Sequence, residues 1–435
     1  MTAIHQQIAL VTTRTGNIIG AWDVETGTHV ASFKDNASGP NALSLLGQDY
    51  LMAAQAAKGA LHFWTWHKDA VLQRCYAVEP IVAVACSPDA VYCAGGGQSG
   101  TIYLWEVPSG RLLRSWPAHY KAVTVLQFSG DGSILLSGGE DTVALAWFLM
   151  DLLDASAPRN ASQAPQPLHT WSQHTLPITS IHCGRTMDPV VVTTSLDQRC
   201  NVYSMAKGSL LRTIAFPAAL HSAVMDPGEH SLHVGSADGR IFRVSLVGGV
   251  AVESALLNSP AAADISMQAH DREWTPLHGH TQAVTALAYT VDGMFMLSGS
   301  EDGTARVWEV RSSQCMRVIS APDRAPVTGL IVLDRPPHLA SGQGRQGRLS
   351  SSDSGSLSTV SKRPQPLASF CKFMGMQGAM QPWEGPAVLL DGSSTYRGQV
   401  SQTGLLSGMA LTNLAGASSQ PVSLLKPRRD AALFW

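Results

Sequence analysis

One segment of the chain carries a histidine, an aspartate and two serines, which are the residue types of a catalytic triad. These residues are His280, Ser298 or Ser300, and Asp302. In a triad the aspartate orients the histidine, and the histidine takes the proton of the serine hydroxyl. The same groups could instead form a buried chain of hydrogen bonds that ends on the indole N–H of Trp308. Such a chain must be complete, because each unpaired buried polar group costs about 1–3 kcal/mol.

Repetition of this set favours the second interpretation. An aspartate lies six residues before a closing aromatic residue, and a histidine lies 28 or 29 residues before it, in three places. The three sets are His119, Asp141 and Trp147; His174, Asp197 and Tyr203; and His280, Ser298, Asp302 and Trp308. A protein seldom needs several copies of one nucleophile. We therefore predict that these residues are structural hydrogen-bond sets, and we predict no catalytic residue.

The elements that position the last set are three short runs in which every second residue faces the same way. The runs are Val284, Ala286 and Ala288; Met294, Met296 and Ser298; and Ala305, Val307 and Glu309. When the pattern repeats every two residues, alternate side chains point to the same face of a β-strand. The Asp-Gly pairs at 292–293 and 302–303 favour tight hairpin turns between the runs. We expect three antiparallel strands.

A repeat extends this unit over most of the chain. The closing residues Trp22, Trp64, Trp105 and Trp147 are spaced by 41 or 42 residues, and Tyr203, Val244 and Trp308 continue the series. A period near 40 residues is typical of WD repeats, each of which forms one blade of a β-propeller. Two intervals are longer, and they contain turn-rich segments at 154–167 and 248–272 that we interpret as loop insertions. The sequence predicts an all-β, seven-bladed WD40 propeller over residues 1–335.

Closure of the ring can also be predicted. The chain begins partway through a blade, so that the first blade lacks its inner strand. The run VTGLIVL at 327–333 resembles the inner-strand runs that begin at Val123 and Val284. We expect it to pair with the N-terminal strand, which removes exposed sheet edges.

The segment 336–435 lacks the repeat and is rich in serine and glycine. We expect a low-complexity tail that is disordered or that orders only on binding. Its GxGxxG match at 342–347 has neither the strand nor the helix that a dinucleotide site needs. Arg345 and Arg348 could at most contact RNA weakly and without sequence preference.

Composition narrows the class of protein. Among 435 residues, 45% are hydrophobic, and the net charge is −2, which does not favour nucleic-acid binding. Seven cysteines show no metal-ligand spacing, and a reducing compartment is expected. No apolar run reaches the length of a membrane span, and the N-terminus lacks the pattern of a secretion signal. We expect a soluble intracellular protein without a metal or cofactor.

Several stretches resemble one family of propellers, the WD repeat-containing protein 18 family. The first is WSQHTLPITSIHCG, from Trp171 to Gly184, followed by TSLDQ at 194–198. The others are AHY at 118–120, LQFSGDGSILLSGGED from Leu126, and SGSEDGTARVWEVRSSQCMRVI from Ser298. The resemblance covers about residues 9–333.

This resemblance implies a non-enzymatic scaffold subunit of the rixosome, a complex that acts on precursors of the large ribosomal subunit. The implied partners are a large helical scaffold subunit, a second repeat protein, the AAA ATPase midasin and pre-60S particles. The implied location is the nucleus, in nucleolus and nucleoplasm, and the plant counterpart is linked to root initiation. The chain departs from the family pattern in one respect, because no heptads follow Leu333. The family implies self-association through a C-terminal coiled coil, and this sequence gives no support for it.

Two other functions stay open. Trp308, Glu309, Val310 and Arg311 resemble the W-D-x-R ending with which some propellers dock on cullin adaptors, so a substrate receptor of a cullin-RING ubiquitin ligase is the alternative. An enzyme with its site in the central channel is the third hypothesis, and the absence of convergent carboxylates or metal-ligand motifs disfavours it.

Overall fold

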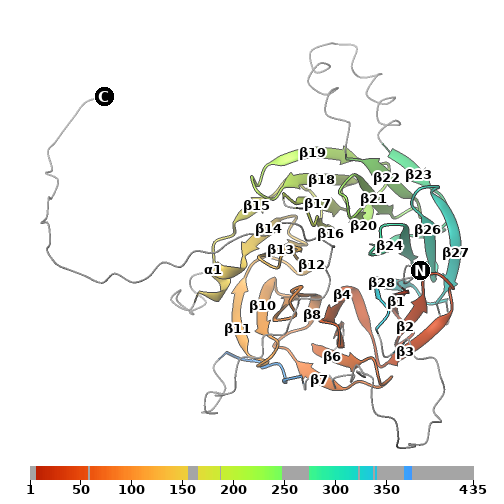
Figure 1. Cartoon of the computed structure of the whole chain (residues 1–435). Helices are drawn as coiled ribbons and strands as arrows, with labels where there is room; N and C mark the ends of the chain where they lie inside the picture. Colours follow the sequence, from red (N-terminus) through yellow and green to blue (C-terminus); the bar gives the residue numbers. More distant parts are fainter. Residues whose placement is uncertain are drawn as a thin grey trace, which may run out of the picture. The chain divides into compact units, whose positions relative to one another are not determined.

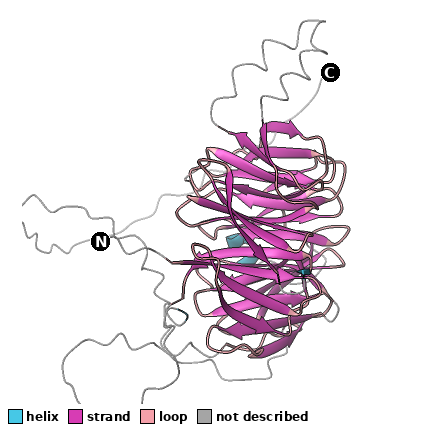
Figure 2. Cartoon of the chain, turned by 90° about the vertical axis from the view of Figure 1, so that its right-hand side faces the viewer, coloured by secondary structure: helices cyan, strands magenta, loops and turns pink. Residues whose placement is uncertain are grey.

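The computed structural model of the chain is a ring of seven four-stranded antiparallel sheets (Figure 1). This confirms the all-β, seven-bladed fold that the repeat predicts. Viewed from the side, the blades form a disc built almost wholly of strands (Figure 2). The structure describes residues 6–56, 59–154, 165–186, 188–246, 274–321, 324–336, 339 and 367–374.

We number the blades 1 to 7 by their closing residues, from Trp22 in blade 1 to Trp308 in blade 7. Blade 1 consists of β28 (Val327–Asp334), β1 (Gln7–Thr13), β2 (Ile18–Asp23) and β3 (His29–Lys34). Blade 2 consists of β4 (Ser38–Leu46), β5 (Tyr50–Gln55), β6 (Ala60–Thr65) and β7 (Gln73–Tyr76). Blade 3 consists of β8 (Ile81–Cys86), β9 (Tyr92–Gly97), β10 (Thr101–Glu106) and β11 (Leu112–Pro117).

The remaining blades follow the same order from the central channel to the rim. Blade 4 consists of β12 (Val123–Phe128), β13 (Ile134–Gly139), β14 (Ala144–Phe148) and β15 (His169–Trp171), with helix α1 (Leu149–Leu153) after β14. Blade 5 consists of β16 (Ile178–Cys183), β17 (Val190–Ser195), β18 (Arg199–Ser204) and β19 (Leu210–Ala215). Blade 6 consists of β20 (Leu220–Met225), β21 (Ser231–Ser236), β22 (Ile241–Ser245) and β23 (Trp274–Leu277). Blade 7 consists of β24 (Val284–Tyr289), β25 (Phe295–Ser300), β26 (Thr304–Glu309) and β27 (Gln314–Ser320).

The ring closes as the sequence predicts. β28, from the far end of the propeller, pairs antiparallel with β1 from Gln7–Asp334 to Thr13–Val327. Every residue of β1 is buried, so this pairing covers a strand that would otherwise be an open edge. The prediction that 327–333 supplies the missing inner strand is confirmed.

Irregular inner strands fasten neighbouring blades to each other. The pairing register shifts after the first residue of β12 and of β24, which turns the next residue toward the following blade. The hydroxyl of Thr124 donates to the carbonyl of Ile178 at 2.7 Å, and that of Thr285 donates to Val327 at 2.7 Å. These bonds cross from blade 4 to blade 5 and from blade 7 to blade 1.

A larger bulge in β4 narrows the central channel. The register shifts between Ser38 and Leu43, and Asn41 adopts a positive φ of 55° within the bulge. The Asn41 amide donates to the carbonyls of Thr124 and Thr179, both at 3.2 Å. Blade 2 therefore reaches across the channel to the inner strands of blades 4 and 5.

Part of the sequence-based interpretation falls on residues outside the described part of the chain. Of the insertions, 155–164 and 248–272 lie outside it, as do the GxGxxG match at 342–347 and most of the predicted tail. Within the described part, no helix is long and apolar enough to cross a membrane.

Candidate functional site

Blade 7 brings His280, Ser298, Asp302 and Trp308 together. In the tautomer that satisfies every group, His280 Nδ1 donates to Asp302 Oδ2 at 2.9 Å, and Ser298 Oγ donates to His280 Nε2 at 2.7 Å. The Trp308 indole N–H donates to Ser298 Oγ at 2.8 Å. The other serine, Ser300, donates to the carbonyl of Gln282 instead. The chain of bonds from aspartate to indole is complete.

Blade 4 repeats this arrangement. His119 Nδ1 lies 3.0 Å from Asp141 Oδ1, and His119 Nε2 lies 2.9 Å from Ser137 Oγ. The Trp147 indole N–H donates to Ser137 Oγ at 3.0 Å. The turn aspartate thus connects through the histidine to the closing aromatic residue in the same order as in blade 7.

Blade 5 differs from blades 4 and 7 in two residues of the set: a threonine replaces the serine, and a tyrosine replaces the closing tryptophan. His174 Nδ1 lies 3.0 Å from Asp197 Oδ2, and His174 Nε2 lies 2.7 Å from Thr193 Oγ1. The Tyr203 hydroxyl donates to the side-chain oxygen of Gln173 at 3.0 Å. Tyr203 therefore fills the place of the closing tryptophan, but its hydrogen bond leads to a different acceptor.

Burial and hydrogen bonding set the charge state of the blade 7 pair. Burial raises the pKa of Asp302, but hydrogen bonds from Thr304 and His280 outweigh it and hold the pKa below its ordinary value. Burial lowers the pKa of His280, more than the nearby Asp302 carboxylate raises it. At neutral pH the pair is a carboxylate beside a neutral imidazole.

The same environment separates this set from a working triad. Ser298 is fully buried, and its hydroxyl is bonded to both of its neighbours in the chain. A nucleophile must be able to reach a substrate carbonyl, which this hydroxyl cannot do. The geometry favours a structural role for the set. In the described part of the chain, no group of three or more His, Cys, Asp or Glu side chains is placed to hold a metal ion.

The structure also shows a contact that the sequence analysis missed. The segment Leu367–Met374, from within the predicted tail, lies between the outer strand of blade 2 and the β10–β11 turn of blade 3 (blue in Figure 1). Phe370 is buried and stacks on Trp105, with ring centroids 5.6 Å apart. The Cys371 N–H donates to the carbonyl of Gly110 at 2.7 Å. The segment is an integral part of this face of the propeller.

Two residues could have signalled this contact. Gly95 occupies the position of Ser137, since each pairs with the residue two before the closing tryptophan. Blade 3 therefore lacks a hydroxyl for the Trp105 indole N–H, which donates to the carbonyl of Cys371 at 3.0 Å instead. The second signal is Cys75, a small residue at the position where blades 3 and 4 carry Trp116 and Trp171. Both signals need the strand register before they can be interpreted.

Comparison with known proteins now identifies the propeller. Residues 71–106, 110–147 and 272–309 match the WD domain, G-beta repeat (WD40) family. WD repeat-containing protein 18 of Bos taurus is 36% identical over 329 residues, which cover 75% of this chain and 72% of that protein. The chain belongs to the WD repeat-containing protein 18 family.

Relatives of this family member occur in plants and fungi as well. Protein ROOT INITIATION DEFECTIVE 3 of Arabidopsis thaliana is 34% identical over 69% of this chain and 66% of its own length. Pre-rRNA-processing protein IPI3 of Yarrowia lipolytica is 31% identical over 74% of this chain and 75% of its own length. The resemblance that the sequence motifs suggest is confirmed.

Replacing Phe370 by alanine should release the docked segment of this family member. Burial of a phenylalanine side chain contributes about 1.5–3 kcal/mol, so the undocked fraction should rise by about tenfold to a hundredfold. Lys372 is already exposed, but a protease needs the backbone around it undocked, so tryptic cleavage after Lys372 should accelerate by a similar factor. Phe373→Ala is the matched control, because Phe373 is 47% exposed. Equal cleavage rates in the two variants would contradict the contact.

Acid should destabilise the propeller through a buried histidine in blade 6. Burial lowers the pKa of His233 from its ordinary 6.5 to about 3, and its Nδ1 accepts the Tyr289 hydroxyl at 2.7 Å. The His233 imidazole binds a proton more readily in the unfolded chain than in the folded one. Its contribution to the free energy of unfolding is therefore fully present above pH 6.5 and is lost as the pH falls toward 3. His233→Gln should flatten this fall in urea titrations at stepped pH. His230→Gln, at a side chain 70% exposed, should leave the slope unchanged.

Proposed function

We propose that this chain is a non-catalytic scaffold subunit of a rixosome-type complex, which supports processing of ribosomal RNA precursors and assembly of the large ribosomal subunit. The observation that carries the proposal is the similarity, over about three quarters of the chain, to fungal proteins named pre-rRNA-processing proteins. Besides the Yarrowia lipolytica protein, Pre-rRNA-processing protein crb3/ipi3 of Schizosaccharomyces pombe is 26% identical over 68% of the chain. This similarity runs through the blades, so the common feature is the propeller.

The geometry of the blade sets supports a scaffold over an enzyme. The residues that resemble a triad are committed to hydrogen bonds inside three blades, and the channel is narrowed by the Asn41 bridge to blades 4 and 5. A ring of this kind presents loops on two faces and seven outer strands on its rim, so that separate surfaces are available to different partners. Rigidity of the ring keeps these surfaces in fixed relative positions.

The proposed partners are those that the family implies: the helical scaffold and repeat-protein subunits of the rixosome, midasin, and pre-60S particles. Contact with RNA would be indirect or weak, because the whole chain carries a formal net charge of only −2. The proposed location is the nucleus, in nucleolus and nucleoplasm, where ribosomal precursors are processed.

The test is affinity purification of the tagged full chain from growing cells, with mass spectrometry and a probe for spacer-containing ribosomal RNA precursors. We expect the rixosome subunits, midasin and precursor RNA. Recovery of cullin adaptors without ribosomal precursors would overturn the proposal in favour of a ligase substrate receptor. Arg311→Ala separates the two directly, because it should abolish capture of an adaptor but leave capture of pre-ribosomal partners unchanged.

A further inference from the structure

Two of the junctions between neighbouring blades share one feature at the rim. In each of them, a residue of the outer strand points into the junction and packs against the closing aromatic residue of the next blade. Trp116 of blade 3 packs edge-on against Trp147 of blade 4, with centroids 5.6 Å apart. Trp171 of blade 4 stacks on Tyr203 of blade 5 at 4.7 Å. In both places a large ring fills the space between blades.

At the junction of blades 2 and 3, the equivalent residue is too small to fill this space. Cys75 pairs with Leu61, three residues before the closing Trp64, just as Trp116 pairs with Ile102. Phe370 of the docked segment supplies the missing ring, and its N–H donates to Cys75 Sγ at 3.3 Å. The junction therefore accepts an extended peptide when its own outer strand leaves room.

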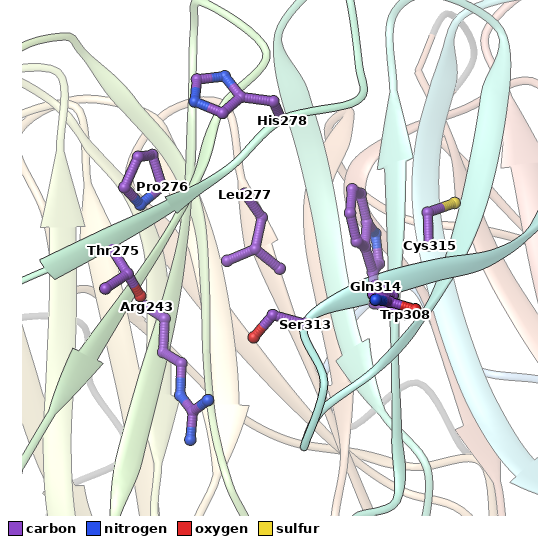
Figure 3. Close-up of a pocket in the computed structure, with 9 residues that line it drawn as sticks. All are labelled: Arg243, Thr275, Pro276, Leu277, His278, Trp308, Ser313, Gln314 and Cys315. Atoms are coloured by element: carbon purple, nitrogen blue, oxygen red, sulfur yellow. The ribbon is translucent and has the colours of Figure 1, made fainter.

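The junction of blades 6 and 7 also leaves room, but no described segment fills it. Leu277 occupies the position of Cys75, because it pairs with Ile241, three residues before Val244. An open pocket of about 680 Å³ lies here, with Leu277 and Trp308 as its floor. Figure 3 shows Leu277 on β23 on one side, and Ser313 and Gln314 of blade 7 on the other.

The two junctions correspond in detail. Ser313 and Gly110 each lie five positions after the closing tryptophan, and Gly110 is the residue whose carbonyl accepts the N–H of the docked peptide. Thr275 occupies the position of Gln73, since each pairs with the residue just before the closing position. With its amide oriented to satisfy both groups, Gln73 bonds the backbone of Leu367 and Ser369. The open pocket thus has polar groups where the occupied junction binds a peptide backbone.

Two differences define what the open pocket would select. Arg243 replaces Phe63, so a guanidinium lines the pocket where an aromatic ring packs on Phe370. Within the described part of the chain, the guanidinium donates a single long bond, of 3.4 Å, to the carbonyl of Val310. Trp308 donates its indole N–H to Ser298 and has none for a ligand. The site should favour an apolar side chain over Leu277 beside a carboxylate at Arg243.

We propose that the pocket between blades 6 and 7 is a docking site for an extended peptide of a partner protein, in which an acidic residue immediately precedes an aromatic one. The aromatic side chain packs on Leu277, the carboxylate bonds Arg243, and the peptide backbone meets the Ser313 turn. In the docked segment, Ser369 precedes the aromatic Phe370 and lies against Gln73. Thr275 is equivalent to Gln73 and is the cross-strand partner of Arg243, so the residue before the aromatic one lies near Arg243 and should be acidic. This site deepens the scaffold role proposed above and rests on it.

A labelling experiment on the full chain tests this site. The probe is a synthetic peptide of residues 367–374 that carries Ser369→Glu and Cys371→Ser. Cys315 lines the pocket and is exposed, so its alkylation by N-ethylmaleimide, followed by peptide mass spectrometry, reports occupancy. We expect the probe to slow alkylation of Cys315 in a saturable manner. Cys86, which is partly buried outside the pocket, is the internal control and should keep its rate.

Two variants make the outcome decisive. Leu277→Trp should fill the pocket, as Trp116 and Trp171 fill their junctions, and abolish protection of Cys315 while the protein stays folded by circular dichroism. Arg243→Glu should lower the affinity of the probe for the pocket by about tenfold or more. The proposal would be overturned if the probe still protected Cys315 in both variants. It would also be overturned if the peptide with the natural Ser369 protected Cys315 as well as the Glu-substituted probe does. A further result would also overturn the proposal: Cys315 is alkylated slowly even without the probe, and deletion of residues 248–272 makes its alkylation faster. In that case the chain itself would occupy the pocket.

This experiment is independent of ribosome assembly. Failure of the probe to protect Cys315, together with normal recovery of ribosomal precursors in the affinity purification, would reject the pocket and keep the scaffold function. Protection of Cys315 with recovery of cullin adaptors alone would keep a peptide site and reject the assembly role.

Discussion

Replacing Asp302 by alanine should destabilise the propeller by about 2–4 kcal/mol, because it leaves the buried imidazole N–H of His280 with only the Thr304 hydroxyl, at 3.3 Å, in place of a carboxylate acceptor. The side chain of His280 is fully buried, and Asp302 is its only carboxylate partner among the described residues, at 2.9 Å. The same carboxylate accepts the backbone N–H of Thr281 at 3.2 Å and of Thr304 at 2.9 Å. Loss of the aspartate therefore loosens the loop that carries His280 as well as the turn before β26. Urea denaturation followed by tryptophan fluorescence measures the change.

Asp238→Ala is the matched control for this effect. Asp238 lies six residues before the closing Val244, as Asp302 lies before Trp308, but blade 6 has no histidine of the set. Its ion-pair partner is Arg240, and both side chains are about one third exposed. A pair of this kind contributes about 1 kcal/mol or less. If both substitutions lowered stability equally, the buried chain of hydrogen bonds would not be what stabilises blade 7.

The blade sets show how far a repeated pattern can be followed from sequence alone. His280, Asp302 and Trp308 could be placed because the backbone repeats, and equal spacing returns a residue to an equal position in each blade. The acceptor of Tyr203 could not be placed in the same way. Its hydroxyl lies farther from the backbone than an indole N–H does, and it reaches Gln173, a residue that the spacing rule does not contain.

Contacts that do not follow the repeat could not be predicted from the sequence for the same reason. Phe370 lies in a segment whose composition indicates disorder, and its partner Trp105 is 265 residues away in the sequence. Its docking depends on the small side chains of Cys75 and Gly95. A pattern of apolar residues cannot distinguish a filled blade junction from an unfilled one, because strand register decides which side chain points into it.

The insertion in β4 is a further example. Gly39, Pro40 and Asn41 read as an ordinary turn sequence, and nothing in their order indicates that the Asn41 amide crosses the channel to Thr124 and Thr179. By contrast, closure of the ring could be predicted, because the run at 327–333 has the composition of an inner strand and β1 lacks one. A missing element in a repeat is itself a strong signal.

Removal of β28 should abolish the native fold. Val327 and Leu330 are buried against β1 and blade 7, and each contributes about 1.5–3 kcal/mol. Without β28, the N–H and C=O groups on one edge of β1 lose their partners, and the Thr285 hydroxyl loses the Val327 carbonyl. The summed loss is comparable to the whole stability of an ordinary domain, about 5–15 kcal/mol. A chain that ends after Ala325 should therefore aggregate through the exposed strand edge.

A chain that ends after Pro336 is the control, since the two variants both lack Leu367–Met374 and differ only by β28 and the residues beside it. We expect this longer chain to elute as a monomer in size-exclusion chromatography and to unfold cooperatively on heating. The shorter chain should elute in the void volume or show no cooperative transition. A soluble monomer with an unchanged melting temperature in the shorter chain would mean that β1 does not need β28. Since β1 is buried along its whole length, that outcome would also require another segment to cover its edge.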